Sequence, residues 1–217
     1  MKIIYLFFTK MLLRLHAKAY SMAGRLAVKS EGGLHPKHRL TRYHDFFVNH
    51  IQAGQRVLDI GCGCGQVILK TASQKKVGFT GVDISEGNIK SAREFLKGFP
   101  DVVLVCADIW KYEAAAGFDV IIMSNVLEHL KNRTELLRSL TVKFKPAFFL
   151  IRIPMLERDW MVPYKKELGI EWRLDQTHET EYTESEIRKE LGDAGLEIES
   201  ISFRWSEMYI KAVPQKG

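Results

Sequence analysis

Short apolar runs alternate along this chain with segments whose apolar residues recur at helical spacing. Runs of four to six mainly apolar residues are typical of buried strands, and they occur at Val57–Ile60, Gly78–Val82, Val102–Cys106, Phe118–Met123 and Phe148–Ile153. Helical patterns follow Val67 and cover Glu86–Lys97, where Ser85 is the expected cap, and Thr134–Lys143, where Asn132 is the expected cap. Strands that alternate with helices predict an α/β fold, with a mostly parallel sheet and helices on both faces.

The last third of the sequence predicts a different pairing. Thr183 and Glu186 have the spacing of a capping box, which begins a helix that Gly195 ends. The runs Leu196–Phe203 and Met208–Val213 alternate in the manner of paired strands. We therefore expect the sheet to end in an antiparallel pair.

Residues 1–35 form a predicted N-terminal amphipathic arm, which Gly32-Gly33 ends. Lys10 and Arg14 interrupt its apolar segment, which disfavours a secretory signal, and no run of about 20 apolar residues predicts a membrane span. Two interpretations stay open: a helix packed on the domain or on a second subunit, or a helix in residues 1–30 that lies on a membrane surface. The apolar positions recur at helical spacing: Ile3, Ile4, Phe7, Phe8, Met11, Leu12 and Leu15.

Charge and cysteine content refine this division. Residues 1–44 contain nine of the 32 Lys and Arg but one of the 26 Asp and Glu, a formal charge of +8, so the rest of the chain carries −2. The 217 residues suit one domain, and we expect it to span 36–217. Cys62, Cys64 and Cys106 match no zinc spacing, and a Cys62–Cys64 bridge would be strained. We expect reduced thiols in a cytoplasmic protein, peripheral to a membrane if the arm binds lipid.

Candidate chemistry begins at the glycine-rich turn after the first strand. A strand, a glycine turn and a helix form a nucleotide-binding corner, where a ligand can lie against backbone that has no Cβ. The dinucleotide fingerprint G-x-G-x-x-G fails, because its last position is Gln66. The glycines instead follow G-x-G-x-G at Gly61, Gly63 and Gly65, two residues after Asp59.

This spacing resembles motif I of the class I S-adenosylmethionine-dependent methyltransferases, and later segments extend the resemblance in order. Asp83 matches the acid that binds the ribose hydroxyls, and Asp108 the acid that accepts from the adenine amino group, with Ile84 and Ile109 around the ring. Asn125 matches the loop beside the sulfonium. The resemblance implies a Rossmann-like seven-stranded sheet, S-adenosylmethionine as the cofactor and a cofactor-binding set: Asp59, Gly61, Cys62, Gly63, Gly65, Asp83, Ile84, Asp108, Ile109 and Asn125.

The candidate catalytic residues follow the fourth strand and precede the last helix. If a helix begins at Asn125, the spacing puts Asn125, Glu128 and His129 on one face. This element resembles quinone-biosynthesis O-methyltransferases and, with His178, small-RNA 2′-O-methyltransferases, in which such residues hold a divalent metal; those families have Glu at the place of Asn125. Three roles stay open: His129 and His178 act as bases, Glu128, His129 and His178 hold a metal, or Glu128 and His129 are structural.

These observations predict a methyltransferase that acts on an oxygen of a small-molecule, sugar or lipid-linked acceptor. Residues 154–182 are expected to shape the acceptor pocket or to form a local core of aromatic side chains. A catalytically silent S-adenosylmethionine-binding module and an RNA 2′-O-methyltransferase are the alternatives, so nucleic acid stays open as a partner. A nucleotide-dependent reductase is disfavoured by Gln66.

Overall fold

The computed structural model describes residues 1–215. Contacts along this part of the chain group it into two compact units. The first unit consists of Met1–Tyr43 and Leu156–His178, and the second contains the other described residues. The predicted boundary between an arm of residues 1–35 and a domain of residues 36–217 stays a prediction.

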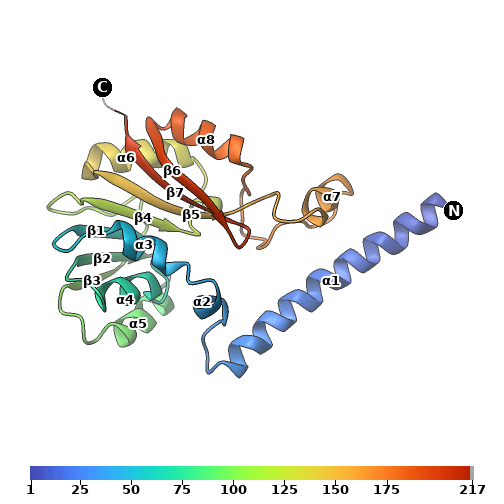
Figure 1. Ribbon diagram of the computed structural model, residues 1–217, viewed down its shortest axis with the longest axis horizontal. Coiled ribbons are helices and arrows are strands. Elements are labelled where there is room, and N and C mark those ends of the chain that lie inside the picture. The colour runs from blue at the N-terminus through green and yellow to red at the C-terminus, as the bar shows by residue number, and fades with distance from the viewer. Residues whose placement is uncertain (216–217) are drawn as a thin grey trace. The chain divides into compact units, whose positions relative to one another are not determined.

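A seven-stranded sheet forms the second unit (Figure 1), and its strand order is β3-β2-β1-β4-β5-β7-β6. Strand β7 is antiparallel to both of its neighbours, and the remaining pairs are parallel. The predicted α/β sheet with an antiparallel terminal strand is confirmed. The strands are β1 (Arg56–Ile60), β2 (Gly78–Asp83), β3 (Val102–Cys106), β4 (Val120–Ser124), β5 (Phe148–Pro154), β6 (Leu196–Arg204) and β7 (Glu207–Pro214).

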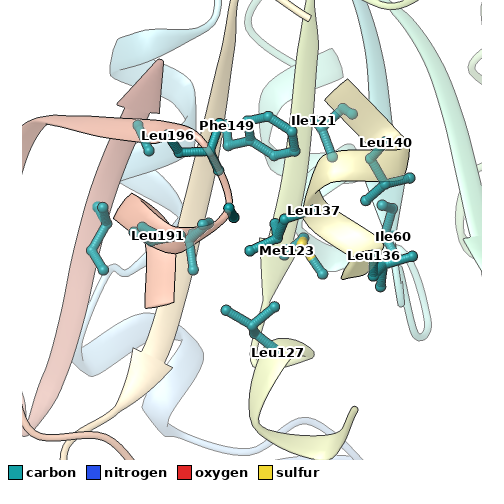
Figure 2. Close-up of a cluster of buried hydrophobic side chains, with 14 of the residues drawn as sticks. Ile60, Ile121, Met123, Leu127, Leu136, Leu137, Leu140, Phe149, Leu191 and Leu196 are labelled. Carbon is teal, nitrogen blue, oxygen red and sulfur yellow. The ribbon is translucent and has the colours of Figure 1, made fainter. Parts of the chain in front are cut away.

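Helices cover both faces of this sheet, as the sequence predicts (Figure 1). One face carries α3 (His44–His50), α4 (Gln66–Ala72) and α5 (Glu86–Phe95), and the other carries α6 (Arg133–Phe144) and α8 (Glu184–Asp193). On the α6 and α8 side, leucines of both helices meet apolar side chains of β1, β4 and β5 (Figure 2). Covered central strands have no water-facing side, which explains why they read as nearly continuous apolar runs.

The helix ends show which capping predictions hold. Ser85 accepts a hydrogen bond from the backbone N–H of Asn88 at 3.3 Å, which confirms the cap of α5. The capping box of α8 is complete, because Thr183 Oγ1 accepts from Glu186 N at 3.3 Å and Thr183 N donates to Glu186 Oε2 at 2.8 Å. Asn132 is the N-cap residue of α6, as predicted, but its backbone is left-handed (φ 53°) where a capping residue is usually extended, and its side chain makes no cap hydrogen bond.

The first unit is helical, with α1 (Lys2–Ser30), α2 (Lys37–Leu40) and α7 (Met161–Glu167). The predicted end of the arm helix at Gly32-Gly33 is confirmed, since both glycines have positive φ and Gly33 N donates to Val28 O at 2.8 Å. Arg42, with φ 49°, separates α2 from α3. Within residues 1–215, no helix combines the length and apolar character needed to cross a bilayer.

Candidate functional site

The carboxyl ends of β1, β2 and β4 carry most of the predicted site residues. Strand β1 pairs with β2 on one side and β4 on the other, so the strand order reverses next to β1. In open parallel sheets, ligands bind in the crevice at such a reversal, outside the carboxyl ends of the strands. The loop after β1 and the loop after β4 therefore lie at the expected binding position.

The three glycines after β1 have different surroundings. All three have positive φ: 65° at Gly61, 53° at Gly63 and 81° at Gly65. A Cβ on Gly61 would lie 2.5 Å from Val126 Cγ2, and one on Gly65 would lie 2.6 Å from Leu96 Cδ1, but a Cβ on Gly63 would meet no heavy atom within 4 Å. Gly61 and Gly65 thus permit close packing of the protein itself, a role that the sequence reasoning missed, and the open backbone is at Gly63.

Asp83 connects this loop to β2 and α5. Its Oδ2 accepts from Gly63 N at 2.9 Å, and its Oδ1 accepts from Ser85 N at 2.8 Å and from Asn88 Nδ2 at 3.3 Å. The side chain is nearly buried, at 8% exposed. These bonds hold the carboxylate in one orientation beside the open backbone of Gly63. The ribose-binding role of Asp83 stays a prediction.

Asp59 is a buried carboxyl group next to Asp83. Burial raises the pKa of Asp59 from 3.8 to about 8, and the charge of Asp83 adds to the effect. Among the described residues, Asp59 Oδ2 and Gln66 Nε2 have no hydrogen-bond partner although both atoms are buried. Buried polar atoms are almost always satisfied, so these two atoms are candidates for hydrogen bonds to a polar ligand.

The residues expected around an adenine ring lie at the ends of β2 and β3. Ala107 N donates to Asp83 O at 3.0 Å, which joins the two strand ends. Asp108 Oδ1 accepts from Trp110 N at 3.0 Å, Ile109 is half-buried, and Ile84 is 76% exposed. An exposed isoleucine here leaves an apolar surface that a ring could cover.

Cys62 lies on the protein side of the glycine loop. A Cβ on Gly81 would come within 2.9 Å of Cys62 Sγ, so the thiol packs against β2. Burial raises the pKa of this thiol above its usual value, which keeps it protonated. The side chain therefore packs against β2, and the cofactor-binding role of Cys62 stays a prediction.

The loop after β4 departs from its sequence-based expectation. Asn125 has a left-handed backbone (φ 55°), and its N–H donates to Arg152 O at 2.7 Å. In the amide orientation that satisfies both groups, Asn125 Nδ2 donates to Arg152 O and Oδ1 accepts from an Arg152 guanidinium N–H, each at 3.2 Å. Arg152 is 4% exposed and pairs with Glu207 at 3.5 Å. Sequence reasoning missed Arg152, although a cation inside the apolar run of β5 was a visible signal.

The condition for a shared helix face, a helix that begins at Asn125, is not met. A 3-10 helix, η1 (Leu127–His129), begins two residues later, so Asn125 does not share a helix face with Glu128 and His129. Glu128 is fully buried, and its carbonyl accepts from Glu179 N at 2.8 Å and Thr180 N at 3.3 Å. His129 is half-buried. The structure therefore holds Glu128 and His129 in a short, backbone-anchored turn directly after β4.

His178 belongs to the first unit, whereas Glu128 and His129 belong to the second. Within its own unit, its carbonyl accepts from Arg173 Nη1 at 2.9 Å, and Arg173 pairs with Glu171 at 2.9 Å. The joint roles of His129 and His178 as bases, and of Glu128, His129 and His178 as metal ligands, stay predictions.

The strand order, the glycine loop and the acidic residues near the carboxyl ends of β1 and β2 are those of a class I S-adenosylmethionine-dependent methyltransferase. A family model described as a methyltransferase domain matches residues 34–201. The chain belongs to this methyltransferase family, and the resemblance noted from its motifs is confirmed.

Known proteins similar to this chain include N- and O-methyltransferases. (S)-Coclaurine N-methyltransferase of Papaver somniferum is 38% identical over 99 residues, which is 42% of this chain and 27% of that protein. A ubiquinone biosynthesis O-methyltransferase of Chromobacterium violaceum is 26% identical over 168 residues, which is 73% of this chain and 72% of that protein. The chain spans 26% to 42% of the length of the first three curated relatives that it matches.

A solved structure shows the same fold. Magnesium protoporphyrin IX methyltransferase from Synechocystis PCC 6803, with bound S-adenosylmethionine, superposes with a TM-score of 0.60 at 19% identity. The match covers 81% of this chain and 79% of that one.

Proposed function

We propose that this chain transfers the methyl group of S-adenosylmethionine to an oxygen of a small-molecule, sugar or lipid-linked acceptor. The observation that carries the proposal is the contact between the loops after β1 and β4. Val126 packs so closely over Gly61 that a Cβ there would lie 2.5 Å from Val126 Cγ2. This contact brings the segment with Glu128 and His129 to the glycine loop.

The cofactor would be held by residues of the second unit. Bound S-adenosylmethionine supplies a methyl group on a sulfonium, which is a good electrophile without further activation. Asp83 suits the ribose hydroxyls, because a carboxylate accepts both hydrogen bonds of a diol, and Asp108 suits the adenine amino group. Asp59 is a buried carboxyl group in β1 and suits a polar contact with the ligand. In-line positioning by such contacts lowers the activation free energy of methyl transfer by several kcal/mol.

The residues of this chain must remove the proton of the acceptor hydroxyl. His129, half-buried directly after β4, is the proposed general base that accepts this proton while the oxygen gains the methyl group. His178 is the second proposed base. Alternatively, Glu128, His129 and His178 hold a divalent metal, which lowers the pKa of the acceptor hydroxyl.

Oxygen is favoured over nitrogen by the extent of the matches. The O-methyltransferase of Chromobacterium violaceum aligns over 73% of this chain, whereas the Papaver N-methyltransferase aligns over 42%. The longer alignment compares more of the domain and is therefore the more informative one. The alternative that the experiments must distinguish from an active enzyme is a module that binds the cofactor but does not catalyse methyl transfer.

Cofactor binding is tested by calorimetric titration with S-adenosylmethionine. Gly63→Val should abolish binding, because the new side chain enters the open space over the loop. Gly54→Val is the matched control: Gly54 also has positive φ (84°) and open space around its Cβ position, but lies in the turn before β1. Equal loss in both variants would mean that backbone strain, not ligand contact, is responsible, and normal binding by Gly63→Val would move the cofactor elsewhere.

Catalysis is tested with labelled S-adenosylmethionine and a panel of hydroxyl acceptors. His129→Ala should lower turnover at least a hundredfold and leave cofactor affinity within about tenfold. His50→Ala, a half-buried histidine of α3, is the control and should keep full activity. If chelator silences the enzyme and Mn²⁺ restores it, and Glu128→Ala is equally inactive, the metal role is supported over the base role. Cofactor binding without turnover on any acceptor would favour the silent module.

A further inference from the structure

Helix α1 exposes a row of apolar side chains along one face. We call this row, whose members follow the 3.6-residue period and therefore share one face, the apolar stripe. Each member is between 45% and 62% exposed. The stripe consists of Ile4, Phe8, Met11, Leu15, Met22 and Leu26.

The opposite face of α1 is the one that the first unit covers. Leu13 is 7% exposed, and at 100° per residue it lies about 160° around the helix from Leu15. Gly24, on the side of Leu13, lies close to His35, since a Cβ there would be 3.5 Å from His35 Nε2. Helix α1 also contacts α7 of the same unit. Packing within the unit therefore accounts for the Leu13 face and leaves the apolar stripe uncovered.

Cations border the stripe. Lys10, Arg14 and Lys18 follow each other at intervals of four residues and line one groove together with Phe7, Met11 and Leu15. Residues 1–30 contain six Lys and Arg and no Asp or Glu. Long basic side chains can bury their methylene stems along an apolar surface while their charges reach outward. The arrangement presents apolar surface and positive charge on adjacent sides of one helix.

We propose that α1 lies along the surface of an anionic lipid bilayer, with the apolar stripe at the acyl boundary and the cations at the lipid phosphates. The 29-residue helix is about 43 Å long, which suits an orientation in the membrane plane. Charge decides against a second copy of the chain as the occupant of the stripe. Two such helices packed stripe to stripe would bring twelve cations together, with no acidic side chain within residues 1–30 to compensate them.

Vesicle co-sedimentation of the full chain tests this proposal. We expect binding to phosphatidylcholine vesicles that contain 30% phosphatidylglycerol to exceed binding to pure phosphatidylcholine vesicles at least tenfold, and to weaken as salt is raised. Replacing Lys10, Arg14 and Lys18 with Gln should lower the partition coefficient about a hundredfold, at roughly fivefold per cation. Equal binding to both vesicle types, or none to either, would overturn the proposal.

Two further variants separate the stripe from a general surface effect. The pair Phe8→Asp and Leu15→Asp should abolish vesicle binding, whereas Val142→Asp, an exposed apolar residue of α6, should not change it. Circular dichroism and cofactor affinity report whether each variant folds. If light scattering instead shows an oligomer that the stripe variants dissociate, and vesicle binding is unchanged, a second copy covers the stripe and the lipid proposal is wrong.

Discussion

Helices α1 and α8 have the same kind of apolar periodicity, but the apolar face is exposed in α1 and buried in α8. Ile187 and Leu191 of α8 are fully buried, whereas Ile4 and Leu15 of α1 are 57% and 60% exposed. Helix α8 packs on α6 and β6, and a capping box fixes its first turn. Helix α1 has no side-chain cap at its first turn and buries Leu13. The comparison teaches that a helical period predicts an apolar face but does not say what covers it.

The largest test of this comparison is the removal of one leucine from each helix. Leu191→Ala should lower the free energy of unfolding by about 2–5 kcal/mol, because it leaves a cavity in a packed core. Leu15→Ala, the matched change in α1, should alter it by no more than about 0.5 kcal/mol. Urea denaturation of the two variants measures both values. A comparable loss at Leu15 would show that the apolar stripe is covered by protein.

The buried carboxyl group of Asp59 provides a second test of the comparison, because α1 contains no acidic residue. The pKa of Asp59 is about 8 in the folded protein, compared with an ordinary value of 3.8. The contribution of this protonated carboxyl group to stability is therefore complete below about pH 4 and is lost as the pH rises to about 8. At 1.36 kcal/mol per pH unit, this loss between pH 5 and pH 8 amounts to roughly 4 kcal/mol. Asp59→Asn should therefore flatten the fall in apo-protein stability over this range, as thermal melts at both pH values would show. An unchanged slope would mean that Asp59 is ionised in the apo protein.

The smallest effect concerns the polar contacts that fix α8. Arg133 and Tyr182 both donate to Glu190, at 2.9 Å and 2.6 Å, and the Arg133 and Glu190 side chains are 21% and 14% exposed. Glu190→Ala should cost about 2 kcal/mol, because a mostly buried cation and hydroxyl lose their partner. Tyr182→Phe, which removes one hydrogen bond, should cost about 1 kcal/mol. If urea denaturation shows the same loss of unfolding free energy in both variants, the ion pair between Arg133 and Glu190 contributes no net stability.

Much of the second unit was predictable from local sequence. The order of strands and helices, the capping box at Thr183, the cap at Ser85 and the antiparallel end of the sheet follow from patterns only a few residues long. Such patterns report which backbone conformation is favoured and which face must be buried. The glycine loop and Asp83 were recognisable for the same reason, since their spacing lies within one strand-turn-helix unit and its successor.

Tertiary structure decided the features that depend on partners distant in sequence. Asn125 takes its left-handed conformation against Arg152, and Val126 lies over Gly61, although these pairs are 27 and 65 residues apart. In this loop the first helical turn is η1, which begins at Leu127 and not at Asn125. The sequence by itself determined that α1 is amphipathic, but only the packing showed that Leu13 is the covered side and the apolar stripe the free one. The physical reason is that periodicity is a property of one segment, whereas burial requires a second surface.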